Sequence, residues 1–177
     1  MIISGLVQLP NAISASRFVI SISMILSVYQ QLWLASGGLY LLAVASDLLD
    51  GSVARRTDQV TKAGGLIDHA ADATFVTVTI ASLALHRELS LLLPILILLA
   101  FTQYVIDSRA HHGHRLIASR LGRYNGIGYF LLAGALLLEQ ILQPGPPWGN
   151  ALLTAYWALV ISTVLSMLDR RFARAQS

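Results

Sequence analysis

The segment from Asp47 to Asp72 reads DLLDGSVARRTDQVTKAGGLIDHAAD and places aspartates at helical spacing beside strongly apolar sequence. Asp47 and Asp50 are three residues apart and Asp68 and Asp72 are four apart, so each pair shares one face of a helix. Carboxylates at membrane depth are costly and repel one another unless they are compensated. An antiparallel pairing of the two helices would gather all four around two Mg²⁺ or Mn²⁺ ions, because hard cations prefer oxygen ligands.

The composition is that of a membrane protein. Of the 177 residues, 55% are hydrophobic and 12% are charged, and the mean hydropathy is +0.66. A soluble domain has about 25% charged residues. The absence of cysteine excludes a disulfide framework and a thiolate metal site. Residues 1–8 lack a basic region, so we expect no cleavable signal peptide.

Six apolar stretches predict an all-α membrane protein with six transmembrane helices. Each stretch approaches the roughly 20 residues that a spanning helix needs. They cover residues 13–29, 32–49, 66–85, 89–106, 127–142 and 148–168. Residues 1–11 are short and amphipathic and contain Pro10 near a helix start, so we expect a helix lying on the membrane surface. The simplest organisation is a single domain over residues 1–177.

The positions of the basic residues predict the orientation. Six spans place both termini on one side, and every Lys and Arg except Arg87 falls on that side. By the positive-inside rule, the termini and the aspartate segment are cytoplasmic. We therefore expect an integral protein of the cell (inner) membrane whose site opens to the cytoplasm.

The aspartates and glycines of this segment also have simpler explanations. Any one aspartate is explained as a solvated acid or a helix cap. Four together, on the cytoplasmic ends of adjacent spans, favour a functional site. Gly51 and Gly64 would let a backbone or a ligand phosphate approach closely, although ordinary membrane-helix packing explains each alone equally well.

The segment resembles the signature of the CDP-alcohol phosphatidyltransferases. It matches D-x-x-D-G-x-x-A-R, eight residues, G-x-x-x-D-x-x-x-D at every fixed position. Pro10, Asn11 and Arg17 are similar to the P-N-x-x-T-x-x-R start of that family, with Ser14 in place of Thr. The six-span layout is similar too, so the resemblance covers most of the chain.

This resemblance implies an enzyme of phospholipid biosynthesis that transfers a phosphatidyl group from CDP-diacylglycerol to an alcohol and releases CMP. By position, the metal ligands would be Asp47, Asp50, Asp68 and Asp72. Asp72 would also be the catalytic base, and the residues lining the CDP pocket would be Gly51, Ala54, Arg55 and Gly64. The expected partners are CDP-diacylglycerol, a small alcohol, membrane lipids and a second copy of the chain, and no nucleic acid.

The alcohol itself is left open. Arg109 and Arg123 could bind an anionic acceptor such as glycerol 3-phosphate or inositol phosphate, but anionic lipids or the topology rule also explain these arginines. LGRYN at 121–125 departs from the Gly-Lys-x-Lys-Thr run of phosphatidylglycerophosphate synthases. The Asp-His-x-x-Asp step at 68–72 looks more like that of the aminoalcohol phosphotransferases.

A divalent-cation transporter is the alternative of another class, since intramembrane carboxylates also bind transported ions. The acids gather at one face and not at the membrane centre, and the sequence offers no second acidic layer. A CMP-release assay separates the two functions.

Overall fold

A computed structural model describes residues 9–56, 61–108 and 119–175, with side chains described for 12–49, 61, 64–108 and 119–170. Within these ranges the chain forms six α-helices and no β-strand, which confirms the predicted all-α class. The helices are α1 (Leu9–Tyr29), α2 (Trp33–Arg56), α3 (Lys62–His86), α4 (Leu92–Asp107), α5 (Arg120–Leu142) and α6 (Pro146–Ala175). Of the predicted surface helix, residues 1–8 lie outside the described ranges, and Pro10 falls in the first turn of α1.

Four of these helices, α1, α3, α5 and α6, are long and apolar enough to cross a membrane. The apolar parts of α2 and α4 are shorter and cover Trp33–Leu49 and Leu92–Asp107. Each predicted apolar stretch thus lies on a helix, while the predicted count of six spans stays a prediction for α2 and α4.

Several helices start elsewhere than the apolar stretches predicted, and α5 and α4 have identifiable local causes. Helix α5 begins at Arg120 and not near residue 127, because the Ser119 hydroxyl accepts a hydrogen bond from the Gly122 N–H at 3.1 Å and caps the helix. Helix α4 begins at Leu92 and not at 89. The preceding turn contains Glu88 at a φ of 56°, and the Ser90 hydroxyl accepts a hydrogen bond from the Leu92 N–H at 3.1 Å.

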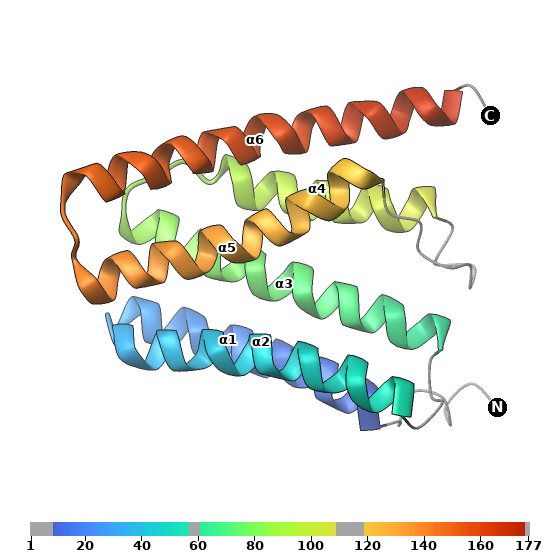
Figure 1. Ribbon diagram of the computed structural model, residues 1–177, viewed down its shortest axis with the longest axis horizontal. Coiled ribbons are helices and arrows are strands. Elements are labelled where there is room, and N and C mark those ends of the chain that lie inside the picture. The colour runs from blue at the N-terminus through green and yellow to red at the C-terminus, as the bar shows by residue number, and fades with distance from the viewer. Residues whose placement is uncertain (1–8, 57–60, 109–118, 176–177) are drawn as a thin grey trace.

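The helices run up and down, and the first turn of α1 and the last turn of α6 lie at the same end of the bundle (Figure 1). Three short turns at the opposite end join α1 to α2, α3 to α4 and α5 to α6. A non-glycine residue with positive φ lies in each turn: Gln31 at 56°, Glu88 at 56° and Gln143 at 47°. The start of α1 and the end of α6 thus lie together, while the side of the membrane on which the termini lie stays a prediction.

Helix α1 packs against both α2 and α3, and these are its largest contacts. Its buried positions include Ser14, Arg17, Ser21, Met24 and Val28, which follow the three- and four-residue spacing of one helix face. On α3, Phe75 is fully buried, with its ring centre 6.2 Å from that of Tyr40 and 6.3 Å from that of Phe130. These contacts fix the rotation of α1 and α3, and with it the direction in which their polar residues point.

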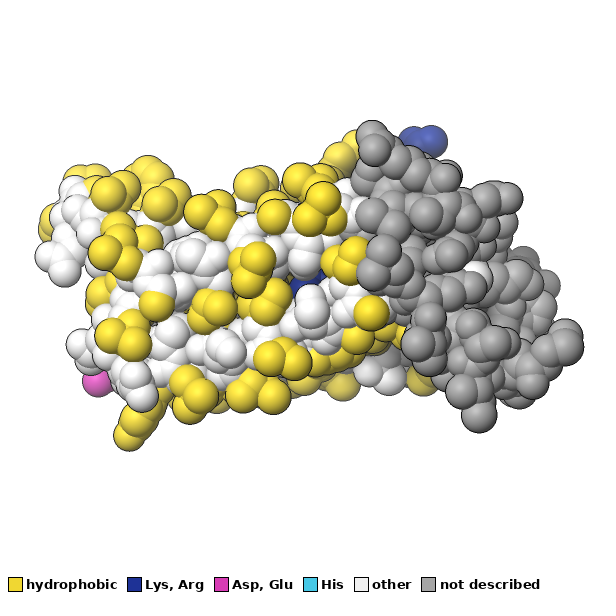
Figure 2. All heavy atoms as spheres, turned by 90° about the horizontal axis from the view of Figure 1, so that it is seen from below, with side chains coloured by type: hydrophobic (Ala, Val, Ile, Leu, Met, Phe, Trp, Pro, Cys, Tyr) yellow, Lys and Arg dark blue, Asp and Glu magenta, His cyan; other side chains and the backbone are white. Residues whose placement is uncertain are grey.

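The outer surface of the bundle is apolar. Seen from below, on the side of α1 and α2, hydrophobic side chains are spread along the described length of the molecule (Figure 2). Exposed hydrophobic residues of α1 and α2 include Val19, Ile22, Leu34, Leu41 and Leu48, each more than half exposed. Such side chains would meet lipid tails, so the surface suits a helix bundle that lies in a bilayer.

Candidate functional site

Three of the predicted aspartates come together on two helices. Asp47 lies on α2, and Asp68 and Asp72 lie one turn apart on α3. Carboxylate oxygens of the three lie within 4.8 Å of one another. The side chains are partly buried, with exposed fractions of 44%, 28% and 26% respectively. The side chain of the fourth aspartate, Asp50, lies outside the described residues.

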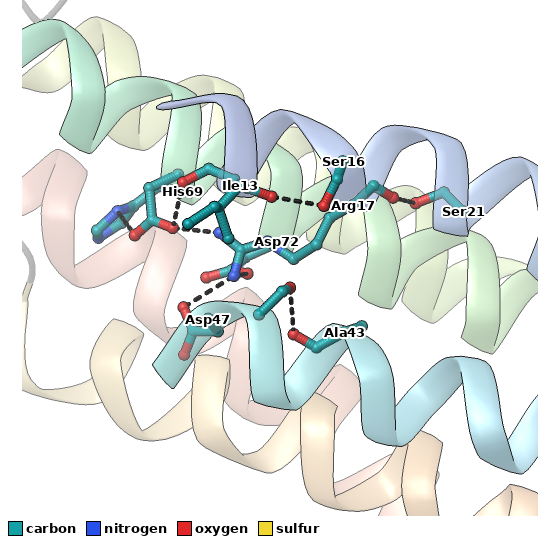
Figure 3. Close-up of polar contacts among 11 residues, drawn as sticks. Ile13, Ser16, Arg17, Ser21, Ala43, Asp47, His69 and Asp72 are labelled. Atoms are coloured by element: carbon teal, nitrogen blue, oxygen red, sulfur yellow. Dashed lines mark hydrogen bonds and ion pairs between the residues drawn. The ribbon is translucent and has the colours of Figure 1, made fainter. Parts of the chain in front are cut away.

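The three carboxylates meet around an arginine of α1. The Arg17 side chain is 0% exposed, and its NH1 group donates to Asp47 Oδ1 at 3.0 Å. The same NH1 lies 3.3 Å from Asp72 Oδ1, and NH2 donates to Asp68 Oδ1. Figure 3 shows Arg17 reaching from α1 toward Asp47 and Asp72. Among the described residues, α1 packs against both α2 and α3, while α2 and α3 have at most weak contact with each other, so Arg17 of α1 lies between their acids.

Arg17 was not among the predicted site residues, because the distribution of charge explained it as a cytoplasmic anchor. A signal was present in the P-N-x-x-S-x-x-R run, which places Ser14 and Arg17 one turn apart on one helix face. Both face the acids, since the buried Ser14 hydroxyl donates to Asp68 Oδ1 at 3.4 Å. That run therefore supplies two residues that contact the acids directly.

The aspartate cluster, by which we mean Asp47, Asp68 and Asp72, fits a divalent cation. Three carboxylates and one guanidinium leave two net negative charges among these four side chains. A Mg²⁺ ion holds its oxygen ligands at about 2.1 Å, so bound oxygens lie roughly 3–4 Å apart. The carboxylates, already within 4.8 Å of one another, need close only slightly to bind such an ion.

A cavity of about 760 Å³ adjoins the cluster. Asp47, Asp72 and His69 line one part of it, and the His69 Nδ1 atom lies 3.7 Å from Asp68 Oδ2. Apolar residues of α2 to α6, among them Val76 and Phe101, make up much of the remaining wall. A polar reacting group near the acids and a hydrocarbon portion of a ligand can therefore occupy one continuous space.

Two arginines line the same cavity. Arg123 lies on the first turn of α5, and Arg170 lies near the end of α6. The Arg170 guanidinium carbon lies 4.8 Å from the centre of the Tyr104 ring, which is a cation–π contact. A Cβ atom at Gly122 would lie 3.1 Å from Arg170 NH2, so glycine at this position lets the guanidinium approach α5. Of the predicted acceptor residues, Arg123 is at the cavity, whereas Arg109 lies outside the described residues.

The predicted CDP-pocket residues are less fully described. The Thr61 hydroxyl caps α3 by accepting a hydrogen bond from the Gly64 N–H at 2.9 Å, and Gly64 lies one turn before Asp68. Gly51, Ala54 and Arg55 lie in the last turns of α2, and their side-chain positions are outside the described residues. The histidines at positions 111, 112 and 114 fall outside them altogether.

The sequence model of the CDP-alcohol phosphatidyltransferase family matches residues 7–174, nearly the whole chain. This range includes the aspartate cluster, Arg17 and both arginines of the cavity. A search of curated protein sequences found no match.

Proposed function

The chain belongs to the CDP-alcohol phosphatidyltransferase family, and we propose that it transfers a phosphatidyl group from CDP-diacylglycerol to a small anionic alcohol. Membership implies an integral membrane enzyme of phospholipid synthesis. The donor, the acceptor and the roles of individual residues belong to the proposal. Its main support is the position of Asp72, which lies in the aspartate cluster and lines the same cavity as Arg123 and Arg170.

We assign cation binding to Asp47, Asp68 and Asp72, with Asp50 as a further ligand by sequence position. The ions, Mg²⁺ or Mn²⁺, would neutralise the diphosphate and stabilise charge on the departing CMP. Partly buried carboxylates suit this role, because water competes less for the cation there than at an open surface.

Asp72 is the proposed general base. The acceptor hydroxyl oxygen attacks the phosphorus that carries the diacylglycerol, and Asp72 takes the hydroxyl proton. The new P–O bond replaces the bond to CMP, which leaves with the electron pair of the broken bond. Asp72 suits this role because it borders the cavity in which an acceptor can lie.

An anionic acceptor is supported by the two arginines of the cavity. Arg123 and Arg170 can pair with a phosphate on the acceptor while its hydroxyl points toward Asp72. Glycerol 3-phosphate and inositol phosphate both have this chemistry, whereas an aminoalcohol would bring a like charge to the arginines. The site is proposed to open to the cytoplasm, where such water-soluble alcohols are found.

The test is a product assay on the purified full-length chain in lipid nanodiscs. CDP-diacylglycerol is supplied with Mg²⁺ or Mn²⁺ and with glycerol 3-phosphate, inositol phosphate or ethanolamine in turn, and CMP and lipid products are identified by mass spectrometry. We expect CMP release and a phosphorylated lipid product with one anionic alcohol only. Release with ethanolamine alone would contradict the acceptor class, and cation transport without CMP release would contradict the enzyme.

A further inference from the structure

We propose that Arg17 is an internal counter-cation that holds the aspartate cluster together before the metal binds, and that it competes with the metal for the same carboxylates. The inference rests on the proposed function in one respect only, namely that the cluster binds a divalent cation. It concerns what the protein's own arginine does toward that cation.

The burial of Arg17 supports the first half of the proposal. Its side chain is fully buried, and a buried guanidinium requires anionic or hydrogen-bonding partners. It meets one oxygen from each acid of the cluster, and these acids come from two different helices. Arg17 therefore joins α1, α2 and α3 at one point and offsets part of the repulsion between the carboxylates.

The geometry of the contacts supports the second half. Arg17 approaches the Oδ1 atom of all three acids. A cation bound among those three oxygens would occupy the space next to the guanidinium, where the two positive charges repel each other in a poorly screened site. Binding of the metal among these oxygens must therefore displace the guanidinium or weaken its contacts. The affinity of the cluster for the metal is lowered accordingly.

The decisive experiment measures Mn²⁺ binding to the full-length chain in detergent, without CDP-lipid, by calorimetry and by electron paramagnetic resonance. Arg17→Met removes the charge and keeps a long side chain, whereas Arg17→Lys keeps the charge. We expect Arg17→Met to bind Mn²⁺ about tenfold or more tightly than the wild type, because the competing charge is gone. Arg17→Lys should stay within about threefold of the wild type, because it retains a point charge at this site.

Thermal unfolding supplies a second readout. In EDTA the Arg17→Met variant should have a lower Tm than the wild type, because the carboxylates then repel one another without a counter-cation. Saturating Mn²⁺ should remove most of that difference. Arg87→Met is the matched control, because Arg87 is also largely buried and paired, but with Glu139 at the opposite end of the bundle. It should lower the Tm and leave the dissociation constant for Mn²⁺ unchanged.

Three results would overturn the inference: equal or weaker Mn²⁺ binding by Arg17→Met, equally tightened binding by Arg17→Lys, or an Arg17→Met chain that stays unfolded in saturating Mn²⁺. The proposed function fails separately. A wild-type chain that binds Mn²⁺ but releases no CMP would refute the enzyme and leave the inference standing. A wild-type chain that binds no Mn²⁺ would refute the metal site and the inference together.

Discussion

The guanidinium of Arg170, on α6, lies over the ring of Tyr104, on α4, at 4.8 Å from the ring centre. This contact joins the two helices at the cavity and holds a positive charge at its wall. Because Gly122 leaves room for the same guanidinium, the position of Arg170 depends on three helices.

Replacing Tyr104 tests whether this contact positions Arg170 for the acceptor. Tyr104→Leu removes the ring and should raise the acceptor KM about three- to tenfold, as the loss of a cation–π contact of roughly 1 kcal/mol implies. Tyr104→Phe keeps the ring face and should change the KM little. Initial rates at saturating CDP-diacylglycerol measure both, and equal effects of the two variants would contradict the positioning role.

Arg123→Ala should raise the acceptor KM far more than the KM for CDP-diacylglycerol, because its charge lines the cavity and would pair with an anionic acceptor. Arg120→Ala is the control, since Arg120 is exposed on the same helix turn and is not part of the cavity wall. Equal changes in both KM values for Arg123→Ala would argue against acceptor binding by this residue.

Asp72→Asn keeps the shape and one oxygen ligand but removes the base. We expect turnover to fall by about 10² or more, as loss of a general base implies, while metal-dependent CDP binding persists in part. Asp47→Asn and Asp68→Asn should weaken metal and CDP binding together. Calorimetric CDP titrations and CMP release distinguish the two patterns, and near-normal turnover of Asp72→Asn would refute the base assignment.

Gly149→Ala should destabilise the far end of the bundle. A Cβ atom there would lie 3.0 Å from Glu139 Oε1 and 3.5 Å from Arg87 NH2, and so would crowd their ion pair. We expect a modest loss of stability, because the Glu139 carboxylate must move away from the new methyl group, seen as a lower Tm with unchanged Mn²⁺ affinity. Gly38→Ala, where a Cβ atom has open space, should not lower the Tm.

The sequence was most informative where function imposes short-range spacing. Asp68 and Asp72 had to share a face of one helix, and the apolar stretches had to be helical in a bilayer. The role of Arg17 was missed because it depends on the packing of α1 between two other helices, and a count of basic residues treats every arginine as an anchor. Arg170 was missed because its place at the cavity depends on how α6 packs against α4 and α5.

The start of α5 shows a different limit. Residues 120–126 are polar and glycine-rich, which indicates a loop when hydropathy alone is considered. The cap from Ser119 makes them helical, and this places Arg123 and the buried Asn125 at the cavity. Ser119 lies three residues before Gly122. Because serine and glycine are both frequent in loops, this pair did not by itself predict the start of a helix.

Helix α4 has 16 residues and is about 24 Å long at 1.5 Å per residue, shorter than the roughly 30 Å hydrocarbon layer of a bilayer. If α4 spans the bilayer as predicted, this difference is a hydrophobic mismatch, which local thinning of the membrane can relieve. Because Ile97, Phe101 and Tyr104 of α4 line the cavity, such a thinned region would border the site. A lipid arriving beside α4 would sit deeper than its neighbours, with its headgroup lowered toward the level of the aspartate cluster.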